Sequence, residues 1–521
     1  MVVAEATGDR NALLTASVSL RKVLLPRNSL KAGVMRSRHR LVLASLAVIV
    51  VAGSVAVAVR APDDTLAASN AHMHARAERL EEAAELSQTT GRRLEALREA
   101  IESGAFGQRQ PISGRPAPGW TGERLMNPKT DDWEPATAAD PRAPFVYLLT
   151  TRYGRPKPCP GNCPTPYIAL EISRDGGRTW TTGRPLCPCK GSGQFDPIIE
   201  VVPNTGDVYA LWMNGYNVVF QESRDHGRTW SPPTPTWGNV AWNDKPVLAT
   251  SDTGKHIYVS WNGPTGGDPW VAQSHDFGET WAQTKLVDSR RYYFAMDADV
   301  MSDGTVVFSE SSLSYSGPAA SAEGRVRHHA FISRNRGDTW ERIVVDVVRR
   351  GVPCTTAGCY DDFYDGHTAV SSDDDGDLVY LYDGAIEVGG PRHIYARRSL
   401  DGGRTWSQPI RLSNAGENAT APAVEARGNG DVRAWFYETN GSPHRWNVWY
   451  RSSDDGGRTW SGRVLLSDAN SGAGYKHPDG FREVYGDYGE IAITSRGDTF
   501  ATWGEGYSWL GPGGTWFNVQ T

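Results

Sequence analysis

One turn sequence occurs six times between residues 173 and 460 of this chain: Ser-x-(Asp/Asn)-x-Gly-x-Thr-Trp. The copies begin at Ser173, Ser223, Ser274, Ser333, Ser399 and Ser453. They recur every 50 to 65 residues or so, and each interval holds several alternating apolar runs of strand length. Repetition at about this period is typical of a propeller or a solenoid built from one small sheet per repeat.

The residue types of the repeat explain why it turns. The Asp or Asn can accept bonds from nearby backbone N–H groups, Gly adopts backbone angles closed to other residues, and Trp packs back between sheets. The motif is the Asp-box, or bacterial neuraminidase repeat, and from about residue 119 to 521 the chain resembles the sialidase-like propeller superfamily. A turn of this kind requires no chemistry, so the resemblance concerns the fold first.

The resemblance implies that each Asp-box joins the third and fourth strands of one blade. The second repeat fits, with strands expected at residues 196–202, 208–213 and 217–222 before its turn. Other first strands are expected near Glu134, Asp244, Met296, Gly366 and Ala421.

A seventh blade begins at Asp487 and ends one strand short, with residues 515–520. The stretch 119–126 resembles 459–466, the strand after the last Asp-box, and can supply the missing strand. Such closure leaves no open sheet edge. We therefore predict an all-β, seven-bladed propeller closed by its N- and C-terminal strands, with six blades, as in familiar sialidases, as the alternative.

Composition agrees with this class. The chain has 19 Trp and 56 Gly, which supply core mass and turns. Its net charge of -6 is spread along the length without a basic stripe, which argues against nucleic acid as a partner.

Residues 41–59 are uncharged and mostly apolar, enough for a helix across a membrane, and the tail 1–40 before them is basic. The basic side stays in the cytoplasm, so the propeller is expected outside it. Either 41–59 is an uncleaved single-pass anchor in the cell membrane, or Met35 begins a signal peptide cleaved near Ala56–Ala58 and the protein is secreted. Residues 60–118 are expected to form a helical stalk followed by a Gly/Pro-rich linker to the propeller at 119–521.

Propeller connectivity places the Asp-boxes on one face. Links between second and third strands, and between blades, lie on the opposite face, where loops longer than a hairpin needs suggest function. The segments that open inner strands there include Glu134-Pro135, Asp196-Pro197 and Asp244-Lys245-Pro246. Their side chains are expected to ring the central channel, although strand-start turn chemistry explains them equally well.

All six cysteines lie in loops of this second face. An even number in an exported chain favours disulfides: Cys354 with Cys359, and the other four cross-linking neighbouring loops of the first blade. Those four are Cys159, Cys163, Cys187 and Cys189. The competing interpretation is a four-thiolate metal site; no other metal and no cofactor is expected.

Three loops on this face combine aromatic and charged residues, at 290–297, 360–367 and 481–488. Aromatic rings give a sugar an apolar surface to pack against, carboxylates bind hydroxyls or transfer protons, and Arg binds an anionic group through hydrogen bonds. The loops predict a carbohydrate cleft that includes Tyr293, Tyr364 and His367. For any single residue, packing between blades is the competing explanation.

A sialidase-type reaction uses a Tyr nucleophile with a carboxylate, an acidic proton donor and an arginine cluster. Matching by residue type gives Tyr488 or Tyr485 with Glu483 or Glu505, and Asp244 or Asp365 as proton donor. The arginine candidates are Arg291, Arg392 and Arg482. The family's Phe-Arg-Ile-Pro sequence is absent, and its nearest analogue, at Arg124, is expected on an outer strand.

Three functions follow from this resemblance. The first is an extracytoplasmic sialidase-like glycoside hydrolase acting on surface or environmental glycans. The second is a noncatalytic propeller that binds a glycan or a protein. The third is a polysaccharide lyase, which needs a Tyr/His pair for proton abstraction and finds candidates in Tyr364 and His367.

Overall fold

The computed structural model describes residues 116–153, 164–189, 193–240, 243–263, 267–288, 291–316, 321–350, 366–439, 441, 446–467, 489–506 and 513–521. The chain divides into two units, Met1–Val59 and Arg60–Thr521, and every described residue belongs to the second. The expected basic tail, membrane or signal segment and stalk lie outside the described residues. Within them, no helix has the length and apolar character needed to cross a bilayer.

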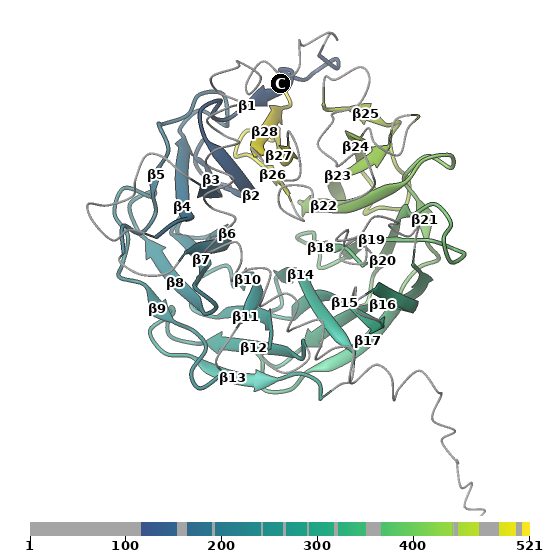
Figure 1. The fold of residues 1–521 in the computed structure, drawn as a ribbon, viewed down its shortest axis with the longest axis horizontal. Helices are drawn as coiled ribbons and strands as arrows, with labels where there is room; N and C mark the ends of the chain where they lie inside the picture. Colours follow the sequence, from purple (N-terminus) through teal and green to yellow (C-terminus); the bar gives the residue numbers. More distant parts are fainter. Residues whose placement is uncertain are drawn as a thin grey trace, which may run out of the picture. The chain divides into compact units, whose positions relative to one another are not determined.

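The second unit consists of seven four-stranded antiparallel sheets arranged as the blades of a propeller, as Figure 1 shows. Seven blades were predicted, and the six-bladed alternative is wrong. Blade 1 is formed by β2 (Asp131–Ala139), β3 (Val146–Tyr153), β4 (Tyr167–Ser173) and β5 (Arg184–Pro185). Blade 2 is formed by β6 (Gln194–Val201), β7 (Val208–Asn214), β8 (Val218–Ser223) and β9 (Thr234–Pro235). Blade 3 is formed by β10 (Asp244–Thr250), β11 (Ile257–Asn262), β12 (Pro269–Ser274) and β13 (Ala282–Lys285).

Blades 4 to 7 continue the same order from the channel outward. Blade 4 is formed by β14 (Tyr292–Val300), β15 (Val306–Ser316), β16 (Ser321–Ser333) and β17 (Glu341–Arg349), and blade 5 by β18 (Thr368–Ser372), β19 (Leu378–Gly384), β20 (His393–Ser399) and β21 (Ile410–Arg411). Blade 6 is formed by β22 (Ala419–Arg427), β23 (Asp431–Thr439), β24 (Trp446–Ser453) and β25 (Val464–Leu465). Blade 7 is formed by β26 (Glu490–Ile493), β27 (Thr499–Gly506), β28 (Gly513–Val519) and β1 (Arg124–Leu125).

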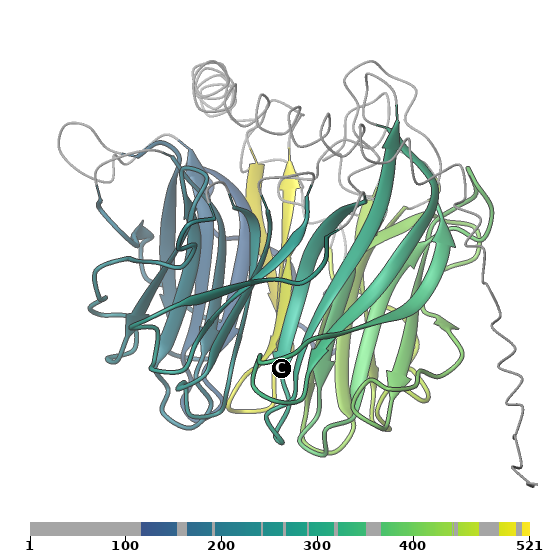
Figure 2. The same cartoon turned by 90° about the horizontal axis from the view of Figure 1, so that it is seen from below.

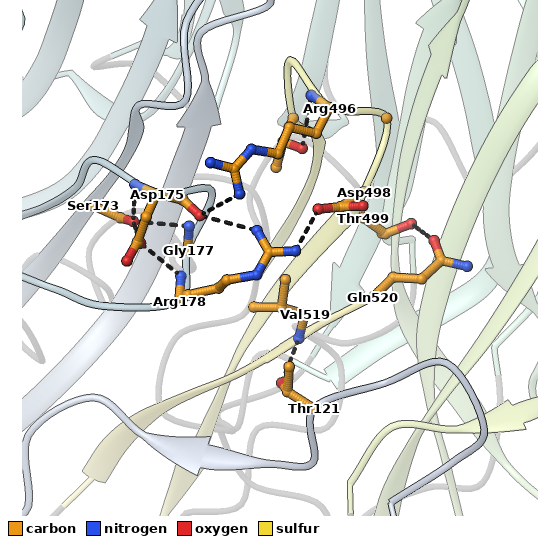
Figure 3. Close-up of polar contacts among 12 residues, drawn as sticks. Thr121, Ser173, Asp175, Gly177, Arg178, Arg496, Asp498, Thr499, Val519 and Gln520 are labelled. Atoms are coloured by element: carbon orange, nitrogen blue, oxygen red, sulfur yellow. Dashed lines mark hydrogen bonds and ion pairs between the residues drawn. The ribbon is translucent and has the colours of Figure 1, made fainter.

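Blade 7 is closed by the two ends of the described region. Strand β1 pairs antiparallel with β28, with Arg124 opposite Phe517 and Leu125 opposite Trp516. Beyond it, the Thr121 N–H donates to the Val519 carbonyl at 2.9 Å, and the Val519 N–H donates to Thr121 Oγ1 at 3.3 Å (Figure 3). The predicted closure is confirmed, and it removes the edge that β28 would otherwise leave open.

The seam between blades 7 and 1 is held by arginines that reach across it. Arg178, in the first Asp-box, donates to Asp498 Oδ2 of blade 7 at 2.8 Å, and Arg496 donates to the Asp175 carbonyl at 3.3 Å (Figure 3). On β1, Arg124 lies over the Phe517 ring, 4.5 Å from its centroid, and donates to the Arg178 carbonyl at 2.9 Å. Arg124 therefore occupies an outer strand, as predicted, and fastens the first Asp-box.

Each Asp-box is a closed set of short hydrogen bonds. In the second copy, Asp225 accepts from the Thr229 N–H at 2.8 Å, from Thr229 Oγ1 at 2.6 Å and from Ser223 Oγ at 2.9 Å. These bonds, chiefly those from Thr229, lower the pKa of Asp225 to about 2. In the fourth copy Asn335 replaces Asp, accepts from the Thr339 N–H at 3.0 Å and donates to Thr339 Oγ1 at 2.9 Å.

The Trp that ends an Asp-box packs toward the preceding blade. Trp281 of blade 3 lies edge-on to Phe220 of blade 2 with ring centroids 5.4 Å apart, and its indole N–H donates to the Gly278 carbonyl at 3.0 Å. Gly278 has a φ of +85°, and a Cβ there would lie 2.4 Å from the Phe220 ring. Gly is therefore required both for the backbone angle and for close approach of the blades.

Candidate functional site

The strand registers place four predicted site residues at the end of the propeller opposite the Asp-boxes. Asp244 begins β10 and pairs with Asn262, whereas the Asp-box of that blade follows Ser274 at the other end. His367 directly precedes β18, Arg392 directly precedes β20, and Glu505 lies near the end of β27. In the side view of Figure 2 the strands of all blades run between the two faces. The sorting of these residues onto one face thus follows from the topology.

His367 is the centre of a polar cluster between blades 5 and 6. It is buried, and its Nδ1 lies 3.5 Å from Oδ2 of Asp383, at the end of β19. Thr420, on β22 of the next blade, donates its hydroxyl to the same Asp383 oxygen at 2.7 Å. The Gly366 N–H donates to the other Asp383 oxygen at 2.8 Å. Three segments therefore converge on one carboxylate, which fixes the position of the imidazole.

Asp383 holds its negative charge although it is fully buried. Burial opposes ionisation, but contact with His367, the positive charges of His367 and Arg392, and the Thr420 hydroxyl together lower the pKa of this carboxyl. An ionised carboxylate beside an imidazole orients the ring and stabilises its protonated form. The mouth of the channel therefore offers acid–base chemistry with Arg392 close enough to influence it.

The two other predicted acids lie at the same end in other blades. Asp244 is buried at the start of the inner strand of blade 3. Glu505 is buried in blade 7 and accepts a hydrogen bond from Trp503 Nε1 at 3.1 Å. Asp244, Glu505 and His367 thus belong to three different blades at this end of the propeller.

Arg291 and Tyr293 have structural contacts in blade 4. The Arg291 guanidinium donates to the Ser312 carbonyl at 2.7 Å and to the Arg325 carbonyl at 2.6 Å, which ties the start of β14 to the β15–β16 hairpin. Tyr293 is 1% exposed, and its hydroxyl accepts from Arg342 at 2.8 Å. Tyr293 is thus buried in an apolar cluster shared by blades 3 and 4, and its ring is not exposed as a surface for a sugar.

The remaining predicted site residues lie outside the described residues. They are Tyr488, Tyr485, Glu483, Asp365, Arg482, Tyr364, Cys159, Cys163, Cys354 and Cys359. The proposed nucleophile, and one of the three candidate arginines, therefore remain predictions from the sequence.

The two described cysteines are joined to each other. Cys187 and Cys189 form a disulfide within one loop, with their Cα atoms 5.1 Å apart. The expected cross-link from this loop to a neighbouring loop is therefore wrong for these two cysteines, because each sulfur is already occupied by the other. Among the described residues, no group of three or more His, Cys, Asp or Glu side chains is placed to hold a metal ion.

The inner strands surround a cavity of about 580 Å³ on the propeller axis, and all seven of them contribute to its wall. His367 is part of this wall at the mouth. Elsewhere in the wall, carboxylates outnumber the cationic Lys245 and Arg427. The carboxylates in the inner strands are Glu200 of β6, Asp297 and Asp299 of β14, Glu425 of β22 and Glu490 of β26.

The channel carboxylates influence one another and also join blades. Burial, followed by the charges of Asp299 and Asp297, raises the pKa of Glu425 to about 8. Burial also raises the pKa of Asp297 to about 7, although the Val370 N–H of the next blade, at 2.9 Å, favours the charged form. Glu490 likewise accepts from the Thr137 N–H of blade 1, at 2.7 Å. At neutral pH these raised pKa values keep much of the acid protonated, so the channel carries less negative charge than its number of carboxyl groups suggests.

The X-Pro segments that open inner strands form β-bulges. Glu134, Asp196, Lys245 and Ala421 each precede a Pro and have φ between 47° and 54°. The register of the inner strand shifts at each of these positions. Glu134 also accepts the Asp196 N–H at 3.0 Å, which links the inner strands of blades 1 and 2. Strand-start geometry therefore accounts for these segments, which matches one of the two explanations that the sequence allowed.

Asp383, Thr420 and the inner-strand carboxylates were not identified from the sequence. Asp383 and Thr420 approach His367 only through strand pairing and blade contact, and the sequence carries no local signal for that. The carboxylates do carry one, since an acid inside an apolar inner strand, such as Glu200 in PIIEVV, conflicts with simple burial.

Comparisons with known proteins agree with this architecture. A family model described as a BNR repeat-like domain matches residues 156–326 and 239–498. A sialidase of Micromonospora viridifaciens is 30% identical over 129 residues, which are 20% of this chain and 19% of that protein. The chain thus matches about a fifth of the length of that relative.

Two solved structures are similar at low identity. The Hadza microbial sialidase Hz136 has a TM-score of 0.40 and 15% identity, over 69% of this chain and 74% of that one. An ulvan lyase of polysaccharide lyase family PL25 has a TM-score of 0.44 and 11% identity, over 76% of this chain and 94% of that one. With its Asp-boxes, its seven four-stranded blades and a family match over more than half of its length, the chain belongs to the BNR repeat-like domain family of sialidase-like β-propellers.

Proposed function

We propose that the protein is an extracytoplasmic sialidase-type glycoside hydrolase whose site is the channel mouth around His367. The family, and the segment shared with a bacterial sialidase, support this chemistry. The position outside the cytoplasm is supported by the apolar run at 41–59 after a basic tail. The substrate would be a surface or environmental glycan.

The observation that carries the proposal is the contact between His367 and Asp383 at the cavity wall. A buried, ionised carboxylate that holds an imidazole is an arrangement for proton transfer, and such transfer contributes about 10²–10⁴-fold to a rate. His367 would move the proton at the scissile oxygen. Arg392 would contribute positive charge at the mouth, and Tyr488 or Tyr485 would be the nucleophile.

A polysaccharide lyase is favoured by the same contact as a second candidate. Elimination from a uronic acid begins when a base removes the proton beside the sugar carboxylate, and an oriented imidazole is suited to that step. Tyr364, three positions before His367 in the sequence, would then be the acid that protonates the leaving oxygen. The two reactions differ in product: free sialic acid in one, an unsaturated uronate in the other.

One experiment separates the possibilities. The purified full-length chain is assayed for sialic acid release from a fluorogenic sialoside and for unsaturated product from uronate polysaccharides, with binding measured on a glycan array. The variants are Asp383→Asn, His367→Gln and, as matched control, Asp431→Asn at the Asp-box end.

Sialic acid release that falls about 100-fold or more in both mouth variants, and not in the control, supports the proposal. Unsaturated product instead establishes the lyase. Binding without turnover establishes a noncatalytic glycan receptor, and neither binding nor turnover overturns a glycan function.

A further inference from the structure

Two histidines face each other at the Asp-box end of blade 3, far along the strands from the channel mouth. His256 directly precedes β11 and His275 directly follows β12. Ile257 pairs with Ser274 in this hairpin, so His256 and His275 form the next cross-strand pair. Their Nδ1 atoms are 2.9 Å apart, and their rings meet at 64°. The Nδ1 atoms of both rings, which can each bind a cation, therefore point toward one position.

The distance between the two nitrogens suits a shared transition-metal ion. Zinc binds imidazole nitrogen at about 2.0–2.1 Å, so an ion on both Nδ1 atoms at their present 2.9 Å separation would subtend an angle of about 90°. That angle is the one between neighbouring ligands of an octahedral ion. Opening the pair by about 0.4 Å would give the tetrahedral angle that zinc prefers in structural sites.

The surroundings of His256 favour its neutral form. Burial, followed by the charges of His275, Arg336 and Lys255, lowers the pKa of His256. The unprotonated ring is the form that coordinates metals. Calcium and magnesium need several oxygen ligands, whereas imidazole nitrogen suits zinc, copper and nickel.

The Asp-box does not require histidine where His275 stands. The other five copies carry Arg174, Arg224, Arg334, Leu400 and Asp454 at this second position. Asp276, the acid of this box, is occupied by Thr280 Oγ1 at 2.5 Å and by Ser274 Oγ at 2.7 Å, as in the other copies. The turn therefore forms without any contribution from the imidazole, whose Nδ1 instead forms a hydrogen bond with His256 Nδ1.

We infer that His256 and His275 form a surface site for one divalent transition-metal ion of the zinc, copper or nickel class. Among the described residues, no third His, Cys, Asp or Glu completes a cluster with them, so the remaining positions are open to water or to an external ligand. Bound metal would clamp the β11–β12 hairpin across its open end. The site lies on the face opposite His367 and does not depend on the proposed glycan chemistry.

Copper(II) and zinc are the probes for this site. Isothermal titration with zinc chloride measures stoichiometry, and electron paramagnetic resonance with one equivalent of copper(II) counts coordinated nitrogens. His275→Arg restores the residue present in three other boxes, and His256→Gln removes the partner. His226→Gln is the matched control, since His226 lies in the second box and stacks on Phe145 with centroids 4.3 Å apart.

We expect one ion per chain, two imidazole nitrogens in the copper spectrum, and a loss of affinity of at least about tenfold in either variant but not in the control. Zinc should also raise the Tm of the wild type and of the control, but not of the two site variants, because an ion that binds only the folded state stabilises it. Undiminished binding in both variants, or a copper spectrum with one nitrogen, would overturn the inference. The wild-type copper spectrum decides the matter even if a variant fails to fold.

Discussion

Trp120 forms an antiparallel bridge with Gln520, so residues from the two ends of the propeller lie side by side in blade 7. Trp120 is 7% exposed and meets Tyr450 of blade 6 edge-on, with ring centroids 5.0 Å apart. The first described segment therefore both completes one blade and packs against its neighbour. Closure of this kind makes the whole ring depend on a short N-terminal stretch.

Trp120→Ala should destabilise the ring strongly. Truncation of a buried Trp costs about 3–5 kcal/mol, which corresponds to a fall in Tm on the order of 6–10 °C for a large domain. Thermal unfolding followed by circular dichroism measures the shift. Phe277→Ala is the control, because this side chain is 42% exposed and its removal should change stability by less than about 0.5 kcal/mol. Equal shifts in the two variants would show that blade 7 is not closed by this segment.

Asp225→Asn should be tolerated, whereas Asp225→Ala should cost about 1 kcal/mol, since the fourth Asp-box already uses Asn335 in this role. The folded pKa of Asp225, about 2, lies below its unfolded value of about 3.9. Its charged form therefore contributes stability above about pH 4, and that contribution is lost as the pH falls through 2. Melting curves of the wild type, Asp225→Asn and Asp225→Ala between pH 2 and pH 7 test the two substitutions and the pH dependence. If the Tm of Asp225→Ala fell further below that of the wild type at pH 2 than at pH 7, the predicted pH dependence would be refuted.

Glu425→Gln should stabilise the protein in alkaline solution. The pKa of Glu425 is about 8 in the fold and about 4.3 in the unfolded chain, so the contribution of its protonated form is complete below pH 4 and is lost as the pH rises through 8. Gln imitates the protonated form. The gain in Tm should be smallest near pH 4, grow up to about pH 8 and level off above it.

The same change at Glu279, an exposed residue of the third Asp-box, is the control and should shift Tm little at any pH. The plateau gain for Glu425→Gln should be on the order of 2 °C or more. A gain in Tm that is greatest at low pH would contradict the raised pKa of Glu425.

Arg152→Met should lower the free energy of unfolding far more than Arg178→Met. Arg152 is 1% exposed and lies 2.6 Å from Asp132 and 2.5 Å from Glu171, both of which would be left buried without their cation. Breaking a buried ion pair costs about 3–5 kcal/mol. Arg178 pairs with Asp498 at 2.8 Å, but its side chain is 34% exposed, and such pairs are worth about 1 kcal/mol or less. Chemical denaturation gives both values, and comparable losses would contradict this difference in burial.

The architecture was predictable because its signals are local or repeated. Six Asp-boxes set the period, and the likeness of residues 119–126 to 459–466 located the strand that closes blade 7. Even the outer position of Arg124 followed from that likeness. These patterns depend on turn chemistry and strand alternation, which a single sequence displays.

The site was less predictable because it is assembled across blades. The aromatic and acidic residues of loop 360–367 indicated His367, but its partners Asp383 and Thr420 come from β19 and from the next blade. Tyr293 was expected at a sugar-binding surface and is instead buried in an apolar cluster shared by blades 3 and 4. Side-chain type alone does not distinguish these two environments.

The most direct test of a glycan site at the channel mouth is a crystal structure of the chain with the glycan that it binds best on an array. We expect glycan density at the channel mouth, in contact with His367 and on the face opposite the Asp-boxes. Density on the Asp-box face or on the outer rim, or the absence of any bound glycan, would contradict it.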